Sequence, residues 1–224
     1  MKTKKLLVML VMVLTAMSAN AQFDPGKWSM QFKLGFGASQ LTNLDQLPLS
    51  TTTPDTQWKG VNSIGLDFEY QATKWLGISA GFGRISQGAA WKDYTDDNIK
   101  YKDPEIKLDY LRVPVVANFY FYKGWAVKTG VQLGYLVDAD FSQHWKENIS
   151  NHDLTTKESL DMEDDVKKFD ISIPVGISYE SGGHFVFDAR YNIGLTKVND
   201  NNDYFQKNLK NGAFVLTFGY KFEL

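Results

Sequence analysis

Three histidines, His144, His152 and His184, are the side chains of this chain best suited to acid–base chemistry. A histidine activates a serine nucleophile only within hydrogen-bond distance, and the nearest such pair in the sequence is His144 with Ser142. Both lie in a polar connection, and the chain has no cysteine to supply a thiol nucleophile or a thiolate zinc ligand. The sequence therefore predicts a protein that is not an enzyme, with His144 and Ser142 as the catalytic alternative.

Acidic side chains gather in two polar connections and raise the question of a metal site. They are Asp161, Glu163, Asp164 and Asp165 in one connection, and Asp200 and Asp203 in the other. Clustered carboxylates can hold Ca²⁺, but the turn-forming glycine of the calcium-loop signature is missing here. We expect solvated acidic loops, no dedicated metal site and no cofactor.

Three tryptophans, Trp58, Trp91 and Trp145, lie in three different long polar stretches. An exposed tryptophan is a natural anchor for a sugar ring or a protein partner. Each of the three is therefore a candidate binding residue for a glycan or a protein. The alternative is that each ring packs against its own loop or against an aromatic girdle.

The first residues have the form of a secretory signal. Three lysines within Met1–Lys5 precede an apolar run, and Ala19-Asn20-Ala21 gives a cleavage site. We expect a signal peptide over residues 1–21 and a single mature domain over residues 22–224. Without the three lysines of the signal, 21 basic residues face 26 acidic ones, a net charge of −5 that argues against a nucleic-acid partner.

Elsewhere the apolar residues alternate with polar or small ones at a period of two, which is typical of β-strands. Eight such segments occur, at residues 28–36, 64–70, 76–82, 111–121, 127–137, 169–179, 185–195 and 214–224. Three connections are hairpin turns, and the other four, near 40–60, 87–106, 139–168 and 196–211, are long and polar. Short turns at one end and long loops at the other predict an all-β fold, an eight-stranded antiparallel up-and-down transmembrane barrel with extracellular loops.

The face that carries the apolar set must point outward, because an eight-stranded barrel is too narrow to hold more than forty bulky side chains. A secreted lipocalin-like barrel, with the apolar set inside, is the rival interpretation. The opposite face is rich in glycine, which suits a narrow lumen: Gly35, Gly37, Gly65, Gly77, Gly81, Gly83, Gly130, Gly134, Gly176, Gly194 and Gly219.

The same inward face carries five positive and five negative side chains. They are Lys33, Arg112, Lys128, Arg190 and Lys221 against Asp67, Glu69, Asp138, Asp170 and Asp188. Ions in so narrow a space must neutralise one another, so we predict a network of salt bridges that plugs the lumen. An ion or proton path is the functional alternative.

Aromatic and basic side chains at the strand ends fit a bilayer. Trp28, Trp75 and Trp125 begin the upward strands, as in a periplasmic girdle. At the other rim three cations, Arg84, Lys107 and Lys197, continue the outward-facing parity beyond the apolar band. They are candidates to meet lipid phosphates or to be solvated strand ends.

The closing residues, Thr217–Leu224, resemble the C-terminal signal of outer-membrane proteins. More of the chain resembles the PorT-like outer-membrane β-barrel family, also described as porin family proteins. The likeness lies in the A-x-A-Q signal end, in Lys33-Leu34-Gly35-Phe36-Gly37, in Leu111-Arg112-Val113-Pro114-Val115 and in Arg190-Tyr191-Asn192-Ile193-Gly194-Leu195-Thr196. The resemblance implies an eight-stranded barrel of the outer membrane, and a few members are similar to accessory proteins of protein secretion.

These observations predict an integral protein of the cell outer membrane, exported and cleaved after Ala21, with a plugged lumen. We expect a non-catalytic protein that supports the envelope or binds a surface partner through its loops. The alternatives are an accessory component of a secretion system, implied by the resemblance, and an enzyme that modifies lipid A. Expected partners are outer-membrane lipid and lipopolysaccharide, the outer-membrane assembly machinery, and a protein or glycan ligand at the loops.

Overall fold

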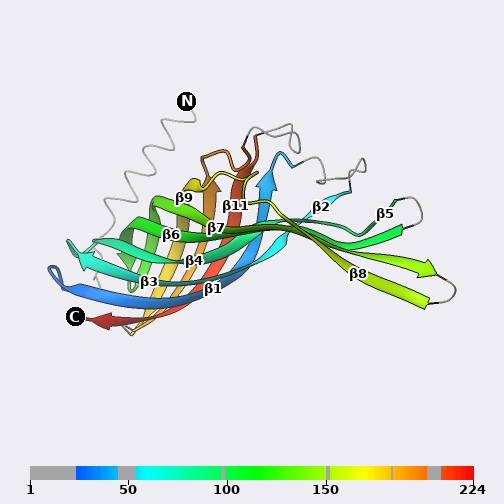
Figure 1. Cartoon of the computed structure of the whole chain (residues 1–224). Helices are drawn as coiled ribbons and strands as arrows, with labels where there is room; N and C mark the ends of the chain where they lie inside the picture. Colours follow the sequence, from blue (N-terminus) through cyan, green and yellow to red (C-terminus); the bar gives the residue numbers. More distant parts are fainter. Residues whose placement is uncertain (1–23, 45–53, 97–98, 150–151, 183, 201–207) are drawn as a thin grey trace, which may run out of the picture.

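A closed ring of eight antiparallel strands forms the body of the protein in the computed structural model (Figure 1), which describes residues 24–44, 54–96, 99–149, 152–182, 184–200 and 208–224. Around the ring the order is β1, β3, β4, β6, β7, β9, β10 and β11, and β11 pairs with β1 to close it. The strands are β1 (Trp28–Thr42), β3 (Lys59–Gln71), β4 (Leu76–Trp91), β6 (Ile99–Tyr122), β7 (Trp125–Ile149), β9 (Phe169–Ser181), β10 (Phe185–Gly194) and β11 (Lys210–Glu223). The predicted fold class is confirmed.

The two faces of the ring divide as the alternation predicts. Phe36, Phe82 and Leu111 on the outer face are 64%, 58% and 52% exposed. On the inner face Lys33 and Arg112 are 3% and 1% exposed. The apolar set therefore faces outward and the polar set inward, which excludes the lipocalin-like alternative.

Short turns and both ends of the barrel chain lie at one end of the ring. The amide of Leu224 donates to the carbonyl of Trp28 at 2.9 Å, so the first and last strands meet there. At the same end Lys123 and Gly124 join β6 to β7 with φ values of 29° and 85°. Two successive residues with positive φ are typical of the tight hairpin turn whose twist matches the flanking strands.

At the opposite end the structure corrects the sequence analysis. The segments 87–106 and 139–168, predicted as loops, are largely strand: β4 continues to Trp91, and β6 and β7 are 24 and 25 residues long. Three further short strands pair with these extensions: β2 (Thr56–Gln57), β5 (Tyr94–Asp96) and β8 (His152–Asp161).

The extensions project far beyond the ring as a sheet of four strands (Figure 1). We call this sheet the ribbon: β5, residues 99–102 of β6, residues 143–149 of β7 and residues 152–158 of β8. These strands carry mainly charged residues on one face and a mixture of aromatic and polar residues on the other, so no regular apolar alternation reveals them and the sequence pattern predicted loops.

Several sequence predictions fall outside the described residues. They are the signal peptide at 1–21 and parts of two long connections, 45–53 and 201–207, the second of which includes Asp203. Among the described residues no helix has the length and hydropathy needed to cross a membrane.

Candidate functional site

The inner face of the ring alternates long charged side chains with glycines in neighbouring strands. Lys33 is paired in register with Gly65 and Gly219. Arg112 is likewise flanked by Gly83 and Gly134. Because cross-strand neighbours lie about 5 Å apart, the missing side chains leave room for the cation to extend across the lumen. The inward glycines thus make space for the long charged side chains of the network.

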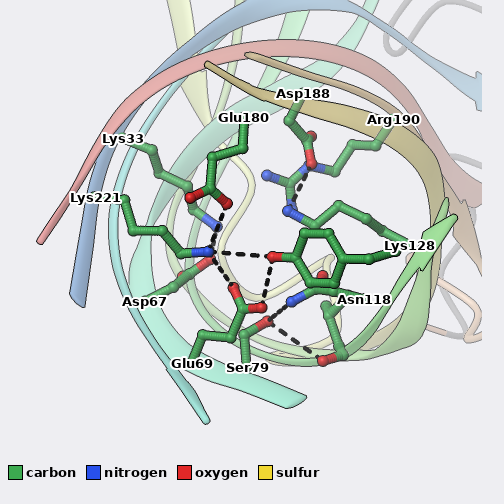
Figure 2. A network of polar contacts seen from close by, with 12 residues as sticks. Lys33, Asp67, Glu69, Ser79, Asn118, Lys128, Glu180, Asp188, Arg190 and Lys221 are labelled. Atoms are coloured by element: carbon green, nitrogen blue, oxygen red, sulfur yellow. Dashed lines mark hydrogen bonds and ion pairs between the residues drawn. The ribbon is translucent and has the colours of Figure 1, made fainter. Parts of the chain in front are cut away.

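Lys221 on β11 is the centre of the part of this network nearest the short turns (Figure 2). Its ammonium group contacts the carboxylates of Glu180 at 2.9 Å and Glu69 at 3.1 Å, and the hydroxyl of Tyr120 at 3.1 Å. The Tyr120 hydroxyl in turn donates to Glu69 at 2.7 Å. One lysine thus offsets two carboxylates that burial would otherwise make very unfavourable.

A second group of ions lies beside the first (Figure 2). Lys33 forms an ion pair with Asp67. Asp188 forms ion pairs with two cations, Lys128 at 3.1 Å and Arg190 at 2.8 Å. The ionic network therefore draws its members from seven strands: β1, β3, β6, β7, β9, β10 and β11.

Arg112 is the least saturated member of the network. Within the described part of the chain its Nη1 and Nη2 atoms have no hydrogen-bond partner, although its side chain is buried. The void nearest the middle of the network has a volume of about 10 Å³ and is lined by Asp67, Lys128, Asp188 and Arg190, among others. That volume is about one water molecule, so this void is too small to hold a chain of waters.

Asp170 lies inside the barrel but apart from the ions. Its carboxylate accepts hydrogen bonds from Thr196 at 3.0 Å and Asn211 at 3.1 Å. The Asn211 amide is also 3.4 Å from the hydroxyl of Tyr110. Asp170 is thus stabilised by neutral donors rather than by a cation.

Asp138 does not belong to the lumen, which corrects the sequence analysis. The register between β6 and β7 shifts so that Asp109 pairs with Asp138 while Tyr110 pairs with Leu136. This β-bulge adds one residue, Val137, to β7 and reverses the parity beyond it. Asp138 consequently lies on the outer face, where it is bound by Lys107 at 3.0 Å.

The outer rim contains a buried carboxylate that the sequence analysis missed. Asp109 shares the parity of the outer face, yet its side chain is fully buried beneath Arg84 and Lys107, which both form ion pairs with it. Arg84 and Lys107, two of the three cations considered as candidates to meet lipid phosphates, are therefore already engaged by acids. The sequence does indicate that Asp109 lies on the outer face, because Lys107, Asp109 and Leu111 alternate with apolar residues that point inward.

Two members of the lumen network were also missed. Glu180 was assigned to the turn between β9 and β10, although it continues the inward parity of Asp170, Ser172 and Ser178. Tyr120 stands between Phe119 and Phe121, and an aromatic residue in this sequence context gives no sign of a polar role inside the barrel. With Glu180 in place of Asp138, the lumen keeps five acidic residues for five basic ones.

Beyond the ionic network, toward the ribbon, the interior becomes apolar. A cluster of buried side chains fills this half, with Trp91, Ile106, Leu136, Phe141 and Met162 among its members. Trp91 is 0% exposed, and its ring meets that of Phe141 at a centroid distance of 6.3 Å and an angle of 79°. The prediction of Trp91 as a surface binding residue is therefore wrong, because β4 continues and turns this ring inward.

The other two candidate tryptophans lie at the ribbon end. Trp58, between β2 and β3, is 51% exposed, and Trp145 on β7 is half-buried. Trp145 is in register with Tyr101, whose ring stacks on Tyr94 at 4.7 Å. The three aromatic residues of the ribbon thus occupy one row on one face.

The histidines and the acidic loop show no assembled catalytic or metal centre in the part of the chain that the structure describes. His144 is paired in register with Lys102 and Lys157, and no hydrogen bond joins it to Ser142. His184 stacks on Tyr220 at 5.5 Å. Glu163 forms an ion pair with Lys168, and no group of three potential metal ligands is found among the described residues.

A closed antiparallel ring with an apolar outer wall, aromatic residues at its short-turn end and an ion-paired interior defines an outer-membrane β-barrel. The family model for the outer membrane protein beta-barrel domain matches residues 20–200, and the chain belongs to this family. The PorT-like assignment within the family stays a prediction. No curated protein matches the chain.

Solved structures with similar folds are outer-membrane barrels with low sequence identity. The attachment invasion locus protein Ail of Yersinia pestis is 13% identical, with 88% of this chain and 99% of that chain covered and a TM-score of 0.43. OprG from Pseudomonas aeruginosa is 14% identical, with coverage of 90% and 99% and a TM-score of 0.41. Neisserial surface protein A is 14% identical, with coverage of 87% and 97% and a TM-score of 0.42.

Proposed function

We propose that this outer-membrane barrel is non-catalytic and acts by binding a surface partner through the ribbon. The observation that carries the proposal is the contrast between the two parts of the molecule. The lumen is filled by ions in one half and by apolar side chains in the other, whereas the ribbon is an ordered sheet that projects past the ring (Figure 1). Since the lumen is filled, we infer that the projecting sheet, and not a channel, recognises the partner.

The orientation follows from the same asymmetry. We propose that the short turns face the periplasm and the ribbon faces the exterior, as in barrels of this architecture. Envelope support through lipid and lipopolysaccharide contacts accompanies this role, because the outer wall carries exposed apolar side chains along its length. The assembly machinery of the outer membrane is the partner that inserts the chain.

Shortening the β7–β8 hairpin tests the proposed function. Ser142 is paired with Ser159, so replacing residues 143–158 by Asn-Gly closes the hairpin at that pair without touching the ring. We expect a strain carrying the shortened protein to match a deletion strain in envelope sensitivity and surface-binding assays. Unchanged gel mobility of the unheated protein controls for barrel assembly, and a wild-type phenotype would contradict the proposal.

Conductance in planar bilayers tests the closure of the lumen. We expect the purified barrel to give no current above background, since the void in the ionic network has a volume of about 10 Å³. Stable unitary currents from the wild-type protein would contradict a closed lumen and would favour a channel over the binding role.

A further inference from the structure

The two faces of the ribbon differ in chemistry, and the difference follows from the register. On one face lie the aromatic row and the pair formed by Gln143 and Glu158, whose side chains are 2.8 Å apart. Tyr94 and Leu160 connect this face to the apolar cluster inside the barrel. It is therefore the face that continues the inner wall.

The opposite face of the ribbon is basic. Lys102 on β6, His144 on β7 and Lys157 on β8 form one row across three strands. In the next row, farther from the ring, Lys100 on β6 is in register with position 146 of β7, which is also a lysine. Since paired residues in an antiparallel sheet share a face, these positions make a single cationic surface, with about 5 Å between strands and about 7 Å between rows.

Within the described residues, the lysines of this surface are not neutralised by an ion pair, in contrast to Lys92 and Lys168. Lys92 is bound to Asp55 at 2.9 Å, and Lys168 to Glu163 at 2.8 Å. By contrast, no acidic side chain of the described residues forms an ion pair with Lys100, Lys102 or Lys157. A local excess of positive charge stands out in a chain with more acidic than basic residues.

The acids nearest to this face are engaged elsewhere. Asp93, which precedes β5 at the register position opposite Lys102, accepts a hydrogen bond from the backbone amide of Asp103 at 3.2 Å. Glu105, which follows the bulge next to Lys102, forms an ion pair with Lys59 on β3. The positive charge of the two rows is therefore left to face solvent, and a surface of this kind attracts a polyanion.

The position of the basic face relative to the barrel wall restricts which polyanions can reach it. It continues the outer wall of the barrel, because Lys107 and Asp140 below it share its parity. It begins nine residues beyond Tyr135, the last exposed aromatic residue of the wall on β7, which corresponds to about 30 Å along the strand. The surface thus faces sideways, past the end of the apolar wall.

We propose that the basic face of the ribbon binds acidic polysaccharide, namely the anionic glycan chains that surround the barrel on the cell surface. Lys100, Lys102 and Lys157 contact the anionic groups, and His144 contributes a polar ring in the middle of the row. The inference rests on the proposed function, since it requires the ribbon to face the exterior.

Binding of soluble polysaccharides to the purified protein in phospholipid nanodiscs tests this assignment. The probes are heparin, which is sulfated, polygalacturonate, which is carboxylated, and dextran, which is neutral. We expect the wild-type protein to bind the two acidic probes and not dextran. The triple variant K100Q/K102Q/K157Q should bind heparin about tenfold more weakly, because three ionic contacts of modest size are lost together.

A variant of equal charge change controls for nonspecific attraction. K74Q/K92Q/K167Q removes three exposed lysines elsewhere and should leave heparin affinity within about twofold. Absence of heparin and polygalacturonate binding, or an equal loss in the control variant, would overturn the assignment. Binding of duplex DNA as tight as that of heparin would show a general polyanion surface and also reject a polysaccharide site.

The two tests separate the two proposals. If K100Q/K102Q/K157Q binds heparin normally while the shortened hairpin abolishes the cellular phenotype, only the polysaccharide assignment is wrong. If the shortened hairpin leaves the phenotype of wild type, the ribbon does not carry the function, whatever it binds in nanodiscs.

Discussion

Replacing Lys221 by methionine is expected to destabilise the barrel by about 3–5 kcal/mol, because it removes one partner of a buried ion cluster. The ammonium group lies between Glu180 and Glu69, and all three side chains are at most 8% exposed. Methionine has nearly the same length, so packing is largely retained while two carboxylates lose their cation. The measurement is the free energy of unfolding in urea, with the protein reconstituted in lipid.

An exposed ion pair provides the matched control. Lys27 and Glu223 lie 2.7 Å apart at the short-turn end, with side chains 50% and 46% exposed. Lys27→Met should leave stability unchanged within error, because solvent screens such pairs. Adding Glu69→Gln and Glu180→Gln to Lys221→Met should recover part of the loss. Equal effects of the two single substitutions would show that the lumen is hydrated and the cluster unimportant.

The strands of the ring could be predicted because their two faces differ in polarity throughout. From Trp28 to Phe36, for example, each apolar residue points outward, and the exposed apolar wall follows directly. The inward charges were predicted by the same parity. Sequence alone could not pair them, because Lys221 meets Glu69 and Glu180 across strands whose order depends on closure of the ring.

The errors arose where that polarity difference ends. A bulge at Val137 reversed the parity of β7 and moved Asp138 to the outer face, and nothing in the local sequence marks this extra residue. The ribbon was missed for a related reason. Its strands carry lysines on one face and aromatic or polar residues on the other, a pattern that resembles a polar loop.

Trp91 shows how this error affects a candidate site. The residue lies in the connection 87–106, which was predicted as a polar loop, and a loop there would have exposed its ring. Because β4 continues through this stretch, paired with β6 as far as Ala90 and with β2 at Trp91 itself, the ring points into the barrel. Its environment is then the apolar cluster and not solvent.

Trp91→Ala should therefore cost about 3–5 kcal/mol in the free energy of unfolding, the range for removing a large aromatic side chain from a core. The ring is 0% exposed and packs edge-on against Phe141, so its removal leaves a cavity in the apolar cluster. Urea titration in lipid measures the loss, as for Lys221.

Trp58→Ala is the natural comparison, because the same side chain is deleted from a site where the ring is 51% exposed. Its cost should stay below about 0.5 kcal/mol. The pair also separates stability from recognition, since a binding role of Trp58 would lower partner affinity without changing the unfolding midpoint. If Trp91→Ala were as stable as Trp58→Ala, the half of the barrel next to the ribbon would not be closed by apolar packing, and bilayer currents should appear in that variant first.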